Sequence, residues 1–279
     1  MSDPKNHHFI PQSIMGRWAT ESGQVNVVMR RDPGEIRYFC TNTKNINSQK
    51  DLYSFIDFSG ALNRSLETDF YAKLDGSIAS FTEEIISTIS AGEVPAFDKK
   101  ARRFFWQALY YNAHKRHPRP YIEDLSEAQI AEIVRDVKGE MPERSEHQIR
   151  ADLLVRFQDE EYMRNVVQLS RATQTKEVVD ALSEIPVLFY IPEDGREFIL
   201  SDTVISESGQ PACAISLGPS VCATTNYRAS HEELRLLSRV EVRSLNEQLY
   251  RRSHLVVGRS RRLLKSLVKR IDGVRLQTE

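Results

Sequence analysis

VNVVMRRDPGEIRYFC, residues 25–40, carries the clearest structural signal in this chain of 279 residues. Two strand-like runs, VNVVMR and EIRYFC, flank the tripeptide Asp32-Pro33-Gly34. Proline presets φ for a turn and glycine tolerates positive φ, so the tripeptide has turn chemistry. Two β-prone runs joined in this way predict a β-hairpin over residues 25–40.

A second region, residues 187–201, has the same pattern. The runs VLFYI and EFILS flank the turn-like tetrapeptide PEDG, which predicts a second hairpin. Two further extended runs, ACAISL and SVCAT, lie on either side of a Gly-Pro break.

The segment between the two predicted hairpins is helical in pattern. Ser126 and Gln129 have the spacing of a capping box. Prolines, which end helices, interrupt the segment at Pro95, Pro118, Pro120, Pro142 and Pro186. We predict helices over residues 62–89, 98–115, 126–138, 146–157 and 159–184.

The C-terminal part, residues 231–271, has an apolar stripe with helical spacing. The step from Val240 to Leu245 breaks the phase, and Gly258 costs about 1 kcal/mol in a helix interior. Two helices and one bent long helix both fit this pattern. The region is basic, with 13 Lys or Arg against 6 Asp or Glu between Arg228 and Glu279.

The order of these elements predicts an α+β fold. Strands from the N-terminal and C-terminal β regions are expected to form a shared sheet around a mainly helical middle, followed by a long C-terminal helix. We predict a single domain, 1–279, with four parts: 1–58 with the first hairpin, 59–185 as the helical middle, 186–227 as the second β region, and 228–279 as the basic helical end.

Composition excludes several classes of protein. The hydrophobic content is 40%, the charged content 28% and the net charge −1, which are globular values without a whole-molecule attraction to nucleic acid or membrane. Three cysteines without a CxxC pair indicate reduced thiols. The polar N-terminus has no signal-like apolar run, and no segment is suited to span a bilayer, so we expect a cytoplasmic protein without a membrane partner.

Two adjacent histidines stand in PKNHHFIPQSIMGRW, residues 4–18. Imidazole is a common metal ligand and a base near neutral pH. Asp202 follows a predicted strand, where side chains often reach a cleft. His7, His8 and Asp202 together would make a site for a divalent metal, Mg, Mn or Zn. The alternative is structural: the two rings bind backbone groups, and Asp202 caps a turn.

Five segments resemble one mainly bacterial family, the domain-of-unknown-function family four-two-three-eight. They are NHHFIPQSIMGRW, TKNINSQKDLYS with Lys44, Asn45, Ile46 and Tyr53, FILSDTVI with Ser201 and Asp202, SLGP, and SLNEQLYRRSHLVV with Asn246. Their order agrees over most of the chain. Val204 departs from the pattern, because the family commonly has Pro at that position. The family brings no settled activity.

The histidine pair also resembles the first strand of HNH-type nucleases, in which one residue holds a metal and the next histidine activates water. Asn42, Asn45 and Asn47 would be the later residues of such a motif. An HNH unit has a strand before its histidine, and only six residues precede His7.

Three charged or aromatic clusters are further candidates. Glu67 and Asp75 share a predicted helix face, and such faces are usually solvated. The run RRFFWQALYYNAHKRH could stack on bases, although its spacing favours core packing. Arg261, Arg262, Lys265 and Lys269 form a basic stripe that could hold phosphates or simply face solvent. P-loop, GxGxxG and GxSxG motifs are absent from the sequence.

Two functional hypotheses follow. The first is a metal-dependent phosphodiester hydrolase, nuclease-like and of bacterial or mobile-element origin, with a defence or toxin-type effector as one such role. His8, His7 and Asp202 would be its catalytic residues, and the basic stripe would hold nucleic acid. The second is a non-catalytic binding or regulatory protein with structural histidines and a protein partner on its helical middle.

Overall fold

The N-terminal hairpin forms as the sequence predicts. In the computed structural model, β2 (Gln24–Arg31) pairs antiparallel with β3 (Glu35–Asn42) over their whole length. The structure describes residues 6–31, 35–57, 59–111, 116, 127–172, 176–202 and 214–274. The predicted turn at 32–34, the end of the predicted helix at 112–115, Ser126 and Val204 lie outside these residues.

The first sheet combines strands from both ends of the chain, as expected, but among the described strands of the predicted second β region only β8 belongs to it. Its order is β3-β2-β12-β8, where β8 is Leu200–Ser201 and β12 is Leu255–Gly258. Because side chains alternate along a strand, Val27 packs into one core cluster and Val28 into a second. The sheet therefore has an apolar core on each face.

The second sheet has the order β11-β7-β10-β9. Its strands are β7 (Val187–Pro192), β9 (Ile215–Gly218), β10 (Val221–Thr225) and β11 (Glu233–Leu237). Strands β9 and β10 correspond to the two extended runs around the Gly-Pro break, and β11 pairs with β7 in parallel. Two short pairs complete the described strands: β1 (Asn6–His8) with β4 (Ser48–Lys50), and β5 (Phe55–Ile56) with β6 (Leu62–Asn63).

The predicted second hairpin is wrong, because β7 and β8 belong to different sheets. Both edges of β7 are taken, one by β10 and the other by β11. Phe198 and Ile199 are buried in the second core cluster, which carries the chain away from β7. Strand β8 then pairs with β12.

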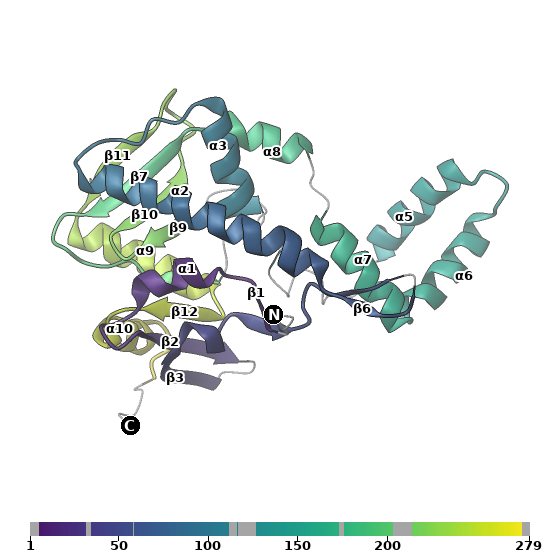
Figure 1. The fold of residues 1–279 in the computed structure, drawn as a ribbon, viewed down its shortest axis with the longest axis horizontal. Helices are drawn as coiled ribbons and strands as arrows, with labels where there is room; N and C mark the ends of the chain where they lie inside the picture. Colours follow the sequence, from purple (N-terminus) through teal and green to yellow (C-terminus); the bar gives the residue numbers. More distant parts are fainter. Residues whose placement is uncertain are drawn as a thin grey trace.

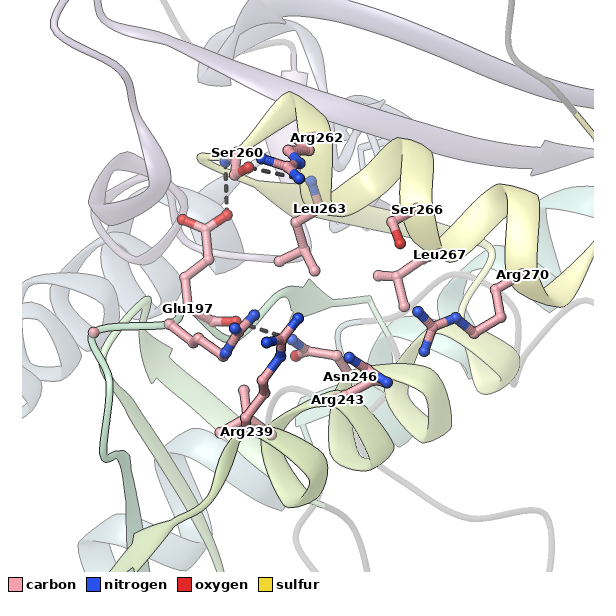
Figure 2. A pocket seen from close by; sticks show the side chains of 13 residues that line it. Glu197, Arg239, Arg243, Asn246, Ser260, Arg262, Leu263, Ser266, Leu267 and Arg270 are labelled. Carbon is pink, nitrogen blue, oxygen red and sulfur yellow. Dashed lines mark hydrogen bonds between the residues drawn. The ribbon is translucent and has the colours of Figure 1, made fainter.

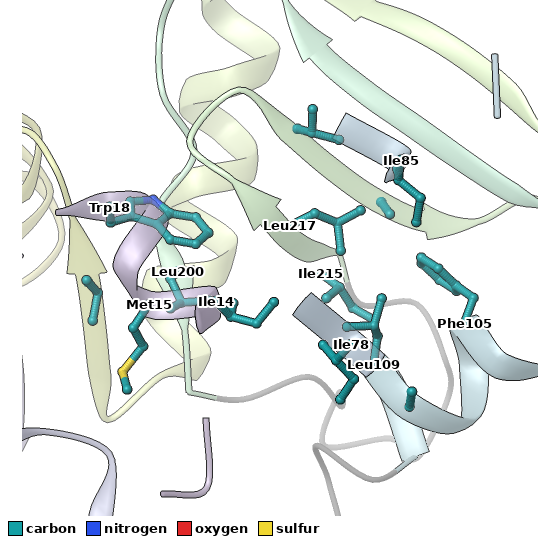
Figure 3. Packing of buried hydrophobic residues seen from close by; sticks show 14 of the residues in the cluster. Ile14, Met15, Trp18, Ile78, Ile85, Phe105, Leu109, Leu200, Ile215 and Leu217 are labelled. Atoms are coloured by element: carbon teal, nitrogen blue, oxygen red, sulfur yellow. The ribbon is translucent and has the colours of Figure 1, made fainter. Parts of the chain in front are cut away.

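The largest core cluster lies between the sheets and the first helices (Figure 3). Side chains from α1 (Gln12–Met15) and α2 (Ala72–Ser90) meet β8 and β9 there, together with α3 (Lys99–Phe105) and the π-helical turn η4 (Trp106–Tyr111). Trp18, in the turn η1 (Gly16–Trp18), is fully buried and donates its indole N–H to the Phe198 carbonyl at 2.7 Å. The prediction that Phe105 and Trp106 are core residues is confirmed.

The helical middle continues into α5 (Glu127–Glu140), α6 (Glu146–Phe157), α7 (Glu160–Ala172) and α8 (Lys176–Ser183). Helices α5 and α6 project away from the two sheets (Figure 1). Residues 159–184 thus form two helices where one is predicted. The predicted helix at 62–89 begins with β6 and a π-helical turn, η3 (Leu66–Tyr71), before α2.

Of the two alternatives for residues 231–271, a single long helix is wrong and two helices are confirmed. Two helices, α9 (Arg239–Arg252) and α10 (Arg261–Ile271), are separated by β12. All four residues of β12 are buried, and a Cβ added to Gly258 would lie 3.2 Å from Leu264. The residues of β12 have the spacing of a helix, but their burial between the two cores favours a strand instead. None of the described helices is long and apolar enough to cross a membrane.

Candidate functional site

His7 lies buried against the segment that follows β4. Its side chain is fully buried, and Nδ1 accepts a hydrogen bond from the backbone N–H of Tyr53 at 2.9 Å. The imidazole also stacks on the Tyr53 ring, with 5.5 Å between centroids. These contacts hold β1 against the segment that follows β4.

His8 points to the other side of β1, as strand geometry requires, and is half-buried. Its Nδ1 lies 3.3 Å from Nε2 of Gln12. Its Nε2 is buried, and no described group binds it with hydrogen-bond geometry. Burial lowers the pKa of His8, while the nearby carbonyl of Lys44 opposes the shift. The ring is therefore biased towards its neutral form.

Asp202 joins two strands of the first sheet. Its carboxylate accepts hydrogen bonds from the backbone N–H groups of His254 and Leu255, both at 3.1 Å. Its own N–H donates to the Leu255 carbonyl at 3.1 Å. The side chain thus extends the pairing of β8 with β12.

The segment after the histidine pair lies beside the end of this strand. Asp202 and the segment Phe9–Pro11 line one small, mainly apolar cavity of about 50 Å³. Ser216 and Leu217 line it as well, so three of the five motif segments meet there. Neither imidazole is among the lining residues. Within the described ranges, which include His7, His8 and Asp202, no three His, Cys, Asp or Glu side chains are grouped to hold a metal.

A buried arginine, Arg116, also lines this cavity and binds the polar groups next to it. Arg116 forms an ion pair with Asp75 through two nitrogens and donates to the His8 carbonyl at 2.7 Å. Its guanidinium lies 4.6 Å from the centroid of the Tyr71 ring. Sequence reasoning missed Arg116, because no pattern around it indicates a buried cation. Its bond to the backbone of the histidine motif shows that the ion pair holds this motif in place.

Glu67 is close to the same ion pair but outside it. Its carboxyl group is largely buried, and Oε2 has no hydrogen-bond partner among the described residues. Burial raises the pKa of Glu67 to about 7, against an opposing effect of Arg116 and a reinforcing effect of Asp75. Glu67 lies in the π-helical turn η3, a type of turn that is frequent at functional sites. It can exchange a proton near neutral pH.

A second candidate site is a groove between α9 and α10 (Figure 2). Arg239 and Arg243 line it from α9, and Arg262 and Arg270 line it from α10. Arg196, from the loop after β7, adds a fifth guanidinium. The volume of this arginine groove is about 510 Å³. Its walls are cationic, and its floor includes apolar side chains such as Val242 and Leu267.

Three of the five groove arginines form no ion pair with any residue that the structure describes. Arg196 is paired with Asp194, and Arg270 with Glu247. In the part of the chain that the structure describes, no group forms a hydrogen bond or ion pair with the remaining three: Arg239, Arg243 and Arg262. Three exposed guanidinium groups in one groove make a site for anions, and planar guanidinium matches phosphate or carboxylate oxygens well.

The predicted basic stripe is divided between two faces of α10. Only Arg262 lines the groove, whereas Arg261 and Lys265 lie over the ring of Tyr38, at 5.2 and 5.7 Å from its centroid. Lys269 is exposed. The signal that we missed is a second spacing, i, i+4 and i, i+8, which aligns Arg239 with Arg243 and Arg262 with Arg270.

The asparagines proposed as later HNH residues have local roles. Asn42 accepts a hydrogen bond from the N–H of Lys44, and Asn45 donates to Oγ1 of Thr41. Asn47 contacts Sδ of Met15.

Asn246 is a buried link between elements. Its Oδ1 accepts from the N–H of Ile199 at 3.0 Å, and its Nδ2 donates to the Glu197 carbonyl at 2.9 Å. It is therefore a structural residue at the floor of the arginine groove.

A family model described as "Protein of unknown function (DUF4238)" matches residues 6–249. No curated protein and no solved structure matches the chain. The matched range contains the histidine motif, Asp202 and the α9 wall of the groove, while the α10 wall lies beyond it.

Proposed function

The chain belongs to the DUF4238 family of proteins of unknown function, and for this member we propose binding of nucleic acid through the arginine groove. The observation that carries the proposal is the presence of three guanidinium groups that form no ion pair with a described residue: Arg239, Arg243 and Arg262. Cations gathered in one groove repel each other, and a bound polyanion removes that repulsion. Release of counterions from the polyanion adds to the affinity.

The distribution of charge around the groove favours a nucleic acid over a small anion. Arg261, Lys265 and Lys269 extend the positive surface from the groove around α10. A small anion would use only the groove, whereas a phosphodiester backbone repeats its charge along its length and can follow the whole surface.

The lining of the groove also indicates which part of a nucleic acid it contacts. No aromatic side chain is among the described residues that line it. Proteins that hold single strands by their bases use aromatic stacking platforms. Contacts here are therefore expected to go to phosphates and sugars, which gives binding that depends on salt and little on base sequence.

The metal-dependent hydrolase has weaker support. Both carboxylate oxygens of Asp202 accept backbone N–H groups, and His7 Nδ1 does the same. Metal coordination by these atoms would have to replace hydrogen bonds that hold the first sheet and β1 in place. Nuclease activity stays a prediction. Its test is a nuclease assay with Mg, Mn or Zn that compares the wild type with His8→Ala.

The test of the binding proposal is a fluorescence anisotropy titration with a labelled oligonucleotide. A groove variant carries Arg239→Ala, Arg243→Ala and Arg262→Ala. We expect its affinity to fall by at least about 10-fold, because each arginine neutralises phosphate charge. The slope of log affinity against log salt concentration should become shallower by about three, one for each lost phosphate contact.

A matched control carries Arg135→Ala, Arg164→Ala and Arg228→Ala. These three arginines are exposed, have no partner among the described residues and lie outside the groove lining. The control changes the net charge by the same amount as the groove variant. Its affinity should stay within about 2-fold of the wild type, because the removed charges lie outside the groove. Equal losses in both triple variants, or no binding by the wild type at low salt, would contradict the proposal.

A further inference from the structure

Glu197 is anomalous in the arginine groove. It is the single acidic residue among the described residues that line the groove. A carboxylate repels phosphate, so a groove that served phosphate alone would bind more tightly without it. Glu197 also forms no ion pair with any described arginine.

The position of this carboxylate is fixed by two elements. Its Oε1 accepts a hydrogen bond at 2.7 Å from the backbone N–H of Ser260, the residue that caps α10. Its backbone carbonyl accepts from Asn246 on α9 at 2.9 Å. Figure 2 shows the side chain standing at the Ser260 end of the groove, across from Arg239. A group held in this way is suited to recognise a ligand.

The second carboxylate oxygen is available to a ligand. Oε2 of Glu197 has no hydrogen-bond partner among the described residues, and it is not enclosed. An ionised carboxylate is only an acceptor, so the matching ligand group must be a donor that lies next to a phosphate. A DNA backbone offers no such donor on its sugars. An RNA backbone offers the 2′-hydroxyl at every residue.

We infer that the ligand of the arginine groove is RNA, with Glu197 accepting a hydrogen bond from a ribose 2′-hydroxyl while the arginines hold the neighbouring phosphates. This inference rests on the proposed function. A carboxylate that binds a ribose hydroxyl beside a phosphate site is a known solution in dinucleotide-binding proteins, where the same two chemical groups have to be recognised together.

The experiment compares three oligouridines that differ only at the 2′ position: RNA, 2′-O-methyl RNA and the deoxyuridine strand. The 2′-O-methyl strand keeps the ribose oxygen but lacks the donor. With wild-type protein at one salt concentration, RNA should bind about 10-fold more tightly than either of the other strands. Equal affinities for the three strands would overturn the inference.

Two variants assign the preference to Glu197. In Glu197→Ala, RNA and deoxyuridine affinities should become equal within about 2-fold, and the deoxyuridine strand should bind at least as tightly as to the wild type. Glu197→Gln has one amide oxygen: when that oxygen accepts from the Ser260 N–H, the NH2 group takes the place of Oε2, so the preference for RNA over the 2′-O-methyl strand should be lost. This variant also serves if Glu197→Ala fails to fold. A preference that persists unchanged in Glu197→Ala would show that another group reads the sugar.

Failure of this inference is distinct from failure of the proposed function. If the groove triple variant weakens all three strands but the strands bind alike, nucleic-acid binding stands and the RNA assignment falls. If no strand binds, the proposed function falls first. Displacement of the RNA by an equal concentration of uridine monophosphate would also overturn the assignment, in favour of a free ribonucleotide.

Discussion

Glu67 is a buried carboxyl group that lies beside an arginine without pairing to it. Arg116 uses its nitrogens on Asp75, on Tyr53 and on the His8 carbonyl, so Glu67 receives charge stabilisation only through space. The effect of burial on Glu67 outweighs the opposing effect of Arg116, and the pKa of Glu67 rises from 4.5 to about 7. The folded protein therefore retains a proton on Glu67 at pH values where the unfolded chain has lost it.

This proton makes stability depend on pH in a defined direction. Stability should fall as the pH rises from 4.5 through about 7 and then level off, because the folded state must ionise a buried group in that range. Glu67→Gln is neutral at every pH. After allowance for solvent screening it should be more stable than the wild type at about pH 8 by about 1 kcal/mol, or about 2–4 °C in Tm, and equal at about pH 4.

The measurement is thermal unfolding of both proteins across this pH range. Glu84→Gln, an exposed change on α2, is the control and should leave the profile unchanged. A Tm difference between Glu67→Gln and wild type that is the same at both pH values would contradict the assignment.

Variants of Asp202 distinguish a structural role of this residue from a role as a metal ligand. Asp202→Ala removes the acceptor for two backbone N–H groups, one of which, on Leu255, is buried. We expect a loss of about 2–3 kcal/mol in the free energy of unfolding, measured with urea, and a smaller loss for Asp202→Asn. A metal ligand would behave in the opposite way: Asp202→Asn would leave stability intact and abolish a metal-dependent activity.

At the scale of elements, Asn246 connects α9 to the segment that leads into β8. It is 1% exposed and supplies both an acceptor and a donor. Asn246→Ala leaves the N–H of Ile199 and the carbonyl of Glu197 without this partner, and should cost about 2–3 kcal/mol in urea unfolding. Ser244→Ala, an exposed change two residues earlier on the same helix, should stay within about 0.5 kcal/mol.

Local sequence patterns predicted some elements correctly and others wrongly. The first hairpin could be predicted, because the turn chemistry and both strand runs are adjacent in the sequence and pair with each other. The same kind of pattern failed at 187–201, where Phe198 and Ile199 pack into a core made by distant residues. The apolar stripe of 231–271 failed for a similar reason, because β12 takes its conformation from its neighbours β2 and β8.

The candidate site shows the same division. The sequence suggested a site of His7, His8 and Asp202; in the structure the segment Phe9–Pro11 shares a cavity with Asp202, and neither imidazole lines it. It could not show that hydrogen bonds already use the carboxylate of Asp202, nor that Arg116 lies behind the histidine motif. Basic residues on α10 were recognised as a stripe, but the groove depends on the packing of α9 beside α10, which no spacing within one helix reveals.

At the scale of the whole molecule, the two ends of the chain depend on one central strand. β12 pairs on one side with β2 of the N-terminal hairpin and on the other with β8. A chain that ends at Arg252 lacks β12 and α10, and therefore leaves the apolar face of β2 at Val28 uncovered. We expect it to lose cooperative thermal unfolding, while a chain that ends at Val274 retains it.

The same strand couples ligand binding in the arginine groove to the stability of the N-terminal hairpin. The two walls of the arginine groove belong to α9 and α10, and residues 253–260, which include β12, join them. A ligand that bridges both walls resists any opening that separates them, so it also protects the strand between them. Amide hydrogens of β2 that are bonded to β12 should then exchange more slowly with deuterium when the groove is occupied, although no ligand atom touches the hairpin.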